Sequence, residues 1–271
     1  MRRALTETER LNRYRVPAVE MAVRILKQLK RHPGPLPLSE ISQSLKVNKS
    51  TCYGVLKTLQ QHGLVSYDEP SKRYSLGLAL MGFGGVVGSR LDALPAARPL
   101  VRRLAEDLGL TSYLAQRLDF KTGIIVERVE HRASADLSIP LGQQVPITAG
   151  AMGKCFLAHL PEPEVERLLS SPGLRPFTAR SIVDVHRYQL ELKRVRETGW
   201  AESVEESLLG HNAVASPVFD AGGQVGMVLG LIGSNRSMPE ERMAFVGREV
   251  KQAAETLTPI LQGRSPACAA G

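Results

Sequence analysis

Residues 38–77, LSEISQSLKVNKSTCYGVLKTLQQHGLVSYDEPSKRYSLG, decide the fold of the first quarter of the chain. Apolar residues recur at helical spacing in LSEISQSL and again in KSTCYGVLKTLQQ, with only KVN between these segments. Asn48 suits the start of the second helix, because its side chain can accept a hydrogen bond from a free first-turn amide. HG ends that helix, and two short alternating segments surround the turn residues DEPSK. The stretch therefore predicts two helices joined by a tight turn, then a β-hairpin.

A further amphipathic helix is expected just upstream, in VPAVEMAVRILKQLK, and HPGPLP ends it. Three helices followed by a basic hairpin are typical of a winged helix-turn-helix, in which the third helix enters the DNA major groove. The exposed face of this helix is predicted to be short, polar and basic near its start. The predicted DNA contacts lie on that face and at the tip of the hairpin: Lys49, Ser50, Thr51, Tyr53, Lys57, Lys72 and Arg73.

Basic residues are concentrated in the same part of the chain. Residues 1–75 contain 14 Lys and Arg against 6 Asp and Glu, whereas residues 76–271 contain 21 of each. The formal net charge of +8 therefore comes from the first quarter alone. This asymmetry indicates a polyanion-binding module, with double-stranded DNA as the partner, joined to a neutral domain. A solvated basic surface, and a winged helix used for protein contact, are the alternatives.

Composition excludes several classes of protein. The 271 residues suffice for two domains, and their 43% hydrophobic and 23% charged content is ordinary for a globular protein. No run of eighteen apolar residues and no apolar signal core occur, so we expect no membrane partner and a cytoplasmic location. Three distant cysteines and scattered histidines predict neither a disulfide framework nor a zinc site, and we expect no cofactor.

The N-terminal motifs resemble the DNA-binding domain of IclR-type bacterial transcriptional regulators. The resemblance rests on LSEI, KST, LKTL, GLV and YSLG. It implies a DNA-binding regulator that responds to a small ligand. Many members have Arg where this chain has Gly54, and Arg is the commonest side chain that reads guanine. We therefore expect Lys57 or Tyr53 to take a larger share of base recognition.

Residues 77–94, GLALMGFGGVVGSRLDAL, are apolar and rich in glycine, so this segment needs a partner surface. We predict a linker helix that packs against its mate in a dimer or tetramer. A helix buried against its own domain is the alternative. A dimer would present two recognition helices to a palindromic operator, roughly 34 Å apart on successive major grooves. The family resemblance also implies a dimerising linker.

The last two-thirds of the chain mixes helices and strands. Helices are expected in LPAARPLVRRLAEDLGL, TAGAMGKCFLAHL, PEPEVERLLSS, VDVHRYQLELKRVRETGW and residues 238–262. Strands are expected in TSYLAQRLD, GIIVERVEH, DLSIPLG, NAVASPVFD and QVGMVLGLIGS. This pattern indicates an α+β sensor domain of GAF-like type, with an antiparallel sheet flanked by helices. ITAGAMGKCFLA and GWAESVEESLLGHNAVASPVFD also resemble the IclR effector-binding domain.

The stretch ITAGAMGKCFLA, residues 147–158, contains the candidates for chemistry. It is not a Walker A loop, because the glycine spacing is wrong and Cys155 replaces the hydroxyl that binds magnesium. A nucleophilic Cys155 would need a base, and His159 lies on the same helical face, but apolar neighbours favour a core cysteine. Glu205, beside Glu206, favours ion pairing or capping over acid–base catalysis. An enzyme that uses Cys155 or Glu205 is the alternative function, and we predict no catalytic residue.

The start of this same helix suits a small carboxylate, because free N–H groups and the positive end of the helix dipole favour an anion. The resemblance implies that effectors, commonly small organic or aromatic acids, bind there. The residues expected to line the site are Leu137, Val145, Gly150, Ala151, Met152, Ser203, Ala213, Gly230 and Ile232. Some relatives that bind very polar acids have Asp, Cys and two Ser at the last four positions. This chain has lost those polar groups, which favours an acid with an apolar body.

The predicted domain organisation has four parts. Residues 1–76 form a winged helix-turn-helix domain with a basic N-terminal arm, and residues 77–94 form the linker helix. Residues 95–262 form the effector-binding domain, and residues 263–271 form a disordered tail. A homo-oligomeric, ligand-responsive transcriptional regulator is the function that these predictions support together.

Overall fold

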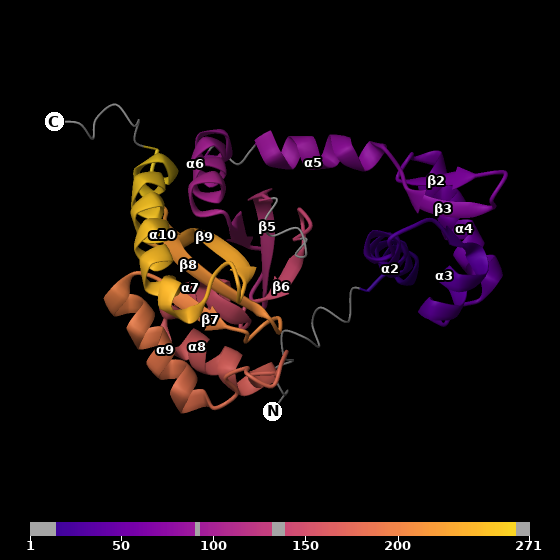
Figure 1. The fold of residues 1–271 in the computed structure, drawn as a ribbon. Coiled ribbons are helices and arrows are strands. Elements are labelled where there is room, and N and C mark those ends of the chain that lie inside the picture. Colours follow the sequence, from indigo (N-terminus) through magenta and orange to yellow (C-terminus); the bar gives the residue numbers. More distant parts are fainter. Residues whose placement is uncertain (1–14, 90–92, 132–138, 264–271) are drawn as a thin grey trace. The chain divides into compact units, whose positions relative to one another are not determined.

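The computed structural model describes residues 15–89, 93–131 and 139–263. Contacts within the chain divide it into two compact units, Met1–Arg90 and Leu91–Gly271, and each is considered by itself (Figure 1). The predicted linker, 77–94, spans this division. The predicted N-terminal arm up to residue 14, Leu137 and the tail from residue 264 lie outside the described residues.

The first unit has the predicted winged helix-turn-helix architecture. Its helices and strands are α2 (Pro17–Arg31), β1 (Leu36–Pro37), α3 (Leu38–Leu45), α4 (Lys49–Gln61), β2 (Val65–Asp68) and β3 (Arg73–Leu76). β2 and β3 form the antiparallel wing, in which Tyr67 is opposite Tyr74. The sequence did not predict β1, which pairs with the other side of β3. This strand ties the loop before α3 to the wing.

Apolar side chains from all three helices meet in one core beneath the wing. Ile25 of α2, Ile41 of α3 and Leu56 of α4 are fully buried. Lys46, in the left-handed region at φ 56°, makes the tight turn after α3. Asn48 occupies the N-cap position of α4 as expected, but its side chain accepts no capping hydrogen bond within the described chain. Packing, rather than capping, therefore holds the recognition helix.

A glycine-rich helix, α5 (Ala79–Ser89), occupies most of the predicted linker. Its apolar side chains are open to solvent: Met81 is 74% exposed, Phe83 64% and Val87 61%. Within the first unit, these side chains are left uncovered.

The second unit contains one six-stranded antiparallel sheet in the order β6-β5-β4-β9-β8-β7. Its strands are β4 (Thr111–Arg117), β5 (Thr122–Val129), β6 (Gln144–Pro146), β7 (Ala201–Val204), β8 (His211–Phe219) and β9 (Val225–Ser234). The hairpin between β8 and β9 was predicted. Together with the helices beside it, the sheet confirms the predicted α+β class.

Helices cover both faces of this sheet (Figure 1). One face carries α6 (Ala93–Leu108) and α10 (Glu240–Leu261), and the other carries α7 (Gly150–Ala158), α8 (Glu162–Leu168) and α9 (Val185–Thr198). A short π-helical turn, Leu169–Gly173, follows α8. Side chains alternate along β9, so that Val228 packs under α7 while Leu229 packs under α10. The sheet is therefore the middle layer of three.

Two strand predictions need correction. The predicted strand DLSIPLG is wrong over its described residues, 139–142, because the chain turns there: Gln143 N–H donates to the Pro140 carbonyl, and Gly142 has φ +70°. The strand forms after this turn, as β6. The second correction is β7, a four-residue edge strand that was not predicted. It places Ser203 opposite Ala213 on β8, beside the start of α7.

Candidate functional site

The outer face of α4 presents a polar surface, with its apolar stripe turned into the core. Lys49, Ser50, Thr51 and Tyr53 are exposed, whereas Cys52 is fully buried. A Cβ atom added at Gly54 would meet nothing within 4 Å, so this position leaves an open gap on the face. The structure thus leaves four of the predicted DNA contacts exposed in the first two turns of the recognition helix.

Lys57 links the recognition helix to the wing. Its ammonium lies 5.6 Å from the centre of the Tyr53 ring on α4 and 5.5 Å from that of Tyr67 on β2. Cation–π attraction at these distances holds the charge beside both elements. Lys57 is therefore a partly preorganised cation at the junction of helix and wing.

The two basic residues of the hairpin differ in their surroundings. Lys72 is exposed at the tip, in the left-handed region at φ 54°. Arg73 begins β3, and its guanidinium donates a hydrogen bond of 2.9 Å to the Pro35 carbonyl before β1. Arg73 therefore also ties the wing to the loop between α2 and α3.

A cavity of about 340 Å³ opens at the start of α7 in the second unit. Its walls come from all six strands, from the start of α7 and from the loops before β6, after β7 and before α9. Seven of the nine residues predicted for the effector site line it: Val145, Gly150, Ala151, Met152, Ser203, Ala213 and Ile232. The fold thus collects into one cavity residues that span about ninety positions of the chain.

Of the two other predicted residues, one lies outside the described residues and the other does not line this cavity. Leu137 lies outside the described residues. Gly230 lies on β9 directly beneath Tyr113, and a Cβ atom added there would collide with the Tyr113 ring. Tyr113 itself lines the cavity in its place. The glycine is therefore a close-approach position that admits a large ring.

Several lining residues were not predicted from the sequence. They include Tyr113, Ile139, Gln143, Phe177, Ser207 and Leu208. The inward alternation of β4 could have found Tyr113, because Ala115, two residues on, faces the same core. No local signal identifies Phe177, Ser207 and Leu208, since they come from loops that only the folded chain brings to the cavity.

The polar end of the cavity is the first turn of α7. Gly150 has φ +57°, and a Cβ atom there would lie 2.5 Å from Ser207 Oγ and 3.3 Å from Ser203 Oγ. Glycine thus allows two hydroxyls to approach the helix start, where first-turn amides lack intrahelical acceptors. Among the described lining residues none is charged, and most are apolar. The geometry suits an anionic head and an apolar body.

The residues proposed for catalysis do not form a reactive set. The Cys155 thiol is fully buried and donates to the Ala215 carbonyl at 3.2 Å, and burial raises the pKa of this thiol. The Glu205 carboxylate accepts hydrogen bonds from Gly210 N–H and Asn235 Nδ2, which lower the pKa of this carboxyl, with a smaller effect from Arg180. These are the packing and ion-pairing roles expected.

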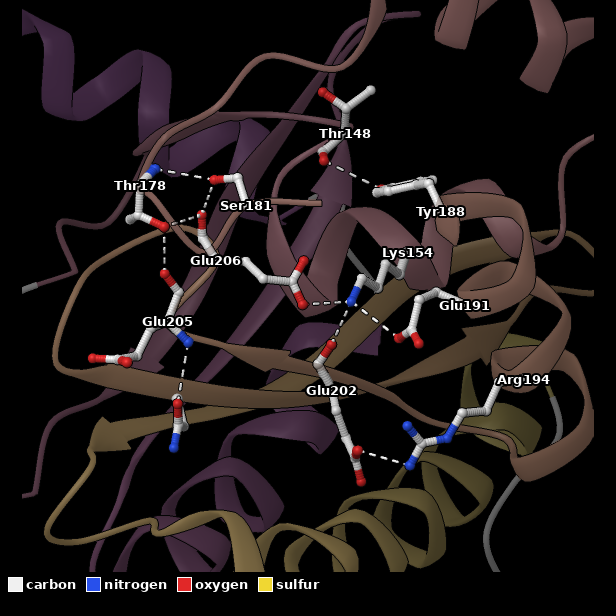
Figure 2. A network of polar contacts seen from close by, with 11 residues as sticks. Thr148, Lys154, Thr178, Ser181, Tyr188, Glu191, Arg194, Glu202, Glu205 and Glu206 are labelled. Atoms are coloured by element: carbon white, nitrogen blue, oxygen red, sulfur yellow. Dashed lines mark hydrogen bonds and ion pairs between the residues drawn. The ribbon is translucent and has the colours of Figure 1, made fainter. Parts of the chain in front are cut away.

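Lys154 has a role that the sequence did not indicate. It is fully buried, and its ammonium is paired with the carboxylates of Glu206 and Glu191 (Figure 2). Burial raises the pKa of the Glu206 carboxyl, an effect that Lys154 opposes. In the described residues, no group of three metal-binding side chains gathers, and no helix there is long and apolar enough to cross a membrane.

Comparisons with known proteins cover both units. The model of the IclR helix-turn-helix domain matches residues 18–69, and that of the bacterial transcriptional regulator IclR C-terminal domain matches residues 86–258. The HTH-type transcriptional repressor AllR of Salmonella typhi is 30% identical over 249 residues, which are 92% of this chain and 91% of the relative.

Solved structures agree with this assignment. An IclR transcriptional regulator from Alicyclobacillus acidocaldarius is 35% identical with a TM-score of 0.81, and the match covers 92% of this chain and all of that one. An IclR homolog from Microbacterium hydrocarbonoxydans, solved in complex with 4-hydroxybenzoate, shares the fold with a TM-score of 0.78 at 19% identity, covering 90% of this chain and 98% of that one.

The winged helix-turn-helix, the three-layer cavity domain and the matches to both parts lead to one conclusion. Regulators of this kind bind DNA and are not enzymes. This chain belongs to the IclR family of bacterial transcriptional regulators.

Proposed function

We propose that this regulator senses a small carboxylic acid with an apolar body in the cavity at the start of α7 and binds a palindromic operator as a dimer or tetramer. The observation that carries the proposal is the make-up of the cavity. Two serine hydroxyls flank an open helix start at one end, and the other described lining residues are mostly apolar. Operator binding fixes the site of action on the chromosome, which favours a cytoplasmic location.

The polar end of the cavity supports recognition of a carboxylate. An anion at a helix start gains typically about 0.3–1 kcal/mol from the dipole, and the hydroxyls of Ser203 and Ser207 can both donate to it. Ala213 and Ile232 contribute only hydrocarbon to the walls. Burying an apolar ring against them contributes roughly 25 cal/mol per Å². The walls therefore favour an aromatic or branched acid over a very small polar one.

The side chain of Gln143 favours an acid that also carries a hydroxyl group. It lines the cavity, and its buried Oε1 atom has no hydrogen-bond partner in the part of the chain that the structure describes. A buried acceptor without a donor costs roughly 1–3 kcal/mol. A phenolic hydroxyl would supply that donor. 4-Hydroxybenzoate, the ligand of the Microbacterium homolog, carries both groups and is the natural first probe.

The recognition surface of the proposal is the outer face of α4 together with the wing. Tyr53 and Lys57 are the candidates for base contacts, because Gly54 offers no side chain there. Lys49, Ser50 and Thr51 at the start of α4 suit phosphate or base edges, and Lys72 and Arg73 suit phosphate. These positions combine a basic wing with a polar helix face.

A dimer is proposed through α5. Met81, Phe83 and Val87 on this helix are more than 60% exposed, and the four glycines of α5 permit close approach of a second helix. The partner surface is a second copy of the chain, since two recognition helices are needed to read a palindrome.

Loss of a wing or helix cation should weaken DNA binding in a salt-dependent way. Lys49→Gln on α4 and Lys72→Gln on the wing are each expected to lower the slope of log K against log[salt] by about one, because each removes one proposed phosphate contact. Fluorescence anisotropy with operator DNA at several salt concentrations measures this slope. Lys193→Gln, on exposed α9, is the matched control. Unchanged slopes in both variants would reject these two assignments.

The cavity should prefer acids with an apolar body. 4-Hydroxybenzoate and benzoate are expected to raise the melting temperature of the protein, and glyoxylate is not. Ile232→Ser should weaken the binding of the aromatic acids by about 5- to 30-fold, because it removes about 1–2 kcal/mol of apolar contact energy. Thermal-shift assays and calorimetric titration measure both effects. Stabilisation by glyoxylate alone would contradict the proposed ligand class.

A charge on α5 should separate the subunits. Phe83→Asp is expected to halve the sedimenting mass at micromolar concentration, because a carboxylate cannot be buried between apolar helices without a partner. Operator affinity should then fall by about tenfold or more, since one particle no longer engages both half-sites. Leu190→Asp, an equally apolar exposed site on α9, is the control. A variant that keeps the wild-type mass would exclude α5 as the interface.

A further inference from the structure

The ammonium group of Lys154 holds together three parts of the second unit. Its Nζ donates to Glu206 Oε1 at 2.6 Å, to the Glu202 carbonyl at 2.8 Å and to Glu191 Oε2 at 3.2 Å (Figure 2). These bonds use all three donors of an ammonium group. The side chain is 1% exposed, so its charge can be buried only because these acceptors surround it.

Two of these partners stand directly before the hydroxyls of the cavity. Glu202 precedes Ser203 on β7, and Glu206 precedes Ser207 on the loop after β7. Lys154 itself lies one helical turn beyond Gly150, on the helix whose start those two hydroxyls approach. A single cation behind the cavity therefore fixes both serines relative to the amides of the first turn of α7.

The same loop is held from its other side by bonds that do not involve α7. Thr178 Oγ1 donates to the Glu205 carbonyl at 2.7 Å, and Ser181 Oγ donates to the Glu206 carbonyl at 2.6 Å (Figure 2). Glu205 has φ +53°, a strained conformation for a residue with a side chain. These contacts anchor the loop to the segment before α9, whereas the Lys154–Glu206 pair anchors it to α7.

We infer that Lys154 is the positioning residue of the acid site: it does not line the cavity, but it sets where the hydroxyls of Ser203 and Ser207 lie against the start of α7. The inference rests on the proposed function of this cavity as a carboxylate site. Its consequence is selective. Loss of the ammonium should reduce the binding affinity that a ligand gains from its carboxylate, because only that group reaches the serines. The apolar contacts of the ligand should remain.

The test compares two variants with a matched pair elsewhere. Lys154→Met keeps the length of the side chain but leaves Glu206 buried without its cation, which is expected to lower the melting temperature. Lys154→Met/Glu206→Gln removes both charges and should recover most of that stability, but the loop after β7 would still lack its ion pair with α7. Lys193→Met/Glu197→Gln makes the same chemical changes in an exposed pair on α9 and should alter nothing.

The decisive readout is the affinity for 4-hydroxybenzoate relative to the neutral 4-hydroxybenzamide, measured by calorimetry on the full chain. In the Lys154→Met/Glu206→Gln variant, the acid should bind about tenfold or more weakly, whereas the amide should change by less than about threefold. Equal weakening of acid and amide would indicate a merely structural role and overturn the inference. Wild-type affinity for the acid in that variant would also overturn it.

Hydrogen exchange without ligand gives an independent result. The hydrogen-bonded amides of residues 203–210 should exchange at least about tenfold faster in the Lys154→Met/Glu206→Gln variant, with β8 unchanged. Unchanged exchange in the loop would overturn the inference that Lys154 holds this loop against α7, whether or not a ligand binds. The wild type could bind none of the acids while loop exchange rises in the variant as expected. In that case the proposed ligand class is wrong, but Lys154 still positions the loop.

Discussion

A buried ammonium group constrains the architecture of the second unit. The charge of Lys154 can remain in the interior only if carboxylates and carbonyls reach it, and those come from α9, β7 and the loop after β7. Because β7 supplies one of these carbonyls, this edge strand of the sheet lies against α7. The gap left in front of the helix start is the cavity. Its polar end therefore results from the way the buried charge is neutralised behind it.

Glycine provides the complementary constraint in front of the helix. Gly150 is in the left-handed region and lies within reach of two serine hydroxyls, and Gly230 leaves room for the Tyr113 ring over β9. A side chain at either position would fill space that the present packing uses. A charge network thus lies behind the start of α7, and close approaches at Gly150 and Gly230 help to shape the cavity in front of it.

Local sequence signals predicted the winged helix-turn-helix well. Periodic apolar residues and the HG that ends α4 identified its three helices, and the DEPSK turn identified the wing. The two-residue strand β1 was missed because a strand this short, containing Pro37, carries no periodicity. The strand expected in DLSIPLG was misplaced because its apolar alternation continues into the turn at Gly142. Alternation alone does not distinguish a strand from an apolar turn.

The candidate cavity was predictable only in part. Resemblance to a family supplied six lining residues, because homologous positions keep their place in the fold, and the free amides expected at the helix start supplied the seventh, Gly150. It failed at Gly230, where the size of Tyr113, a residue more than a hundred positions away, decides what faces the cavity. The role of Lys154 was not predicted, since its partners lie 37 to 52 residues further along the chain. Contacts this distant leave no local pattern.

A regulator that responds to an acid requires the acid site and the operator site to be coupled, and reciprocal binding measures this coupling most directly. The affinity of the full chain for 4-hydroxybenzoate should differ by a factor of about 5 to 150 between free protein and protein saturated with operator DNA. The acid should change operator affinity by the same factor. Non-specific DNA of equal length, at the same salt concentration, should have no such effect. An acid affinity that is identical with and without operator would contradict the account.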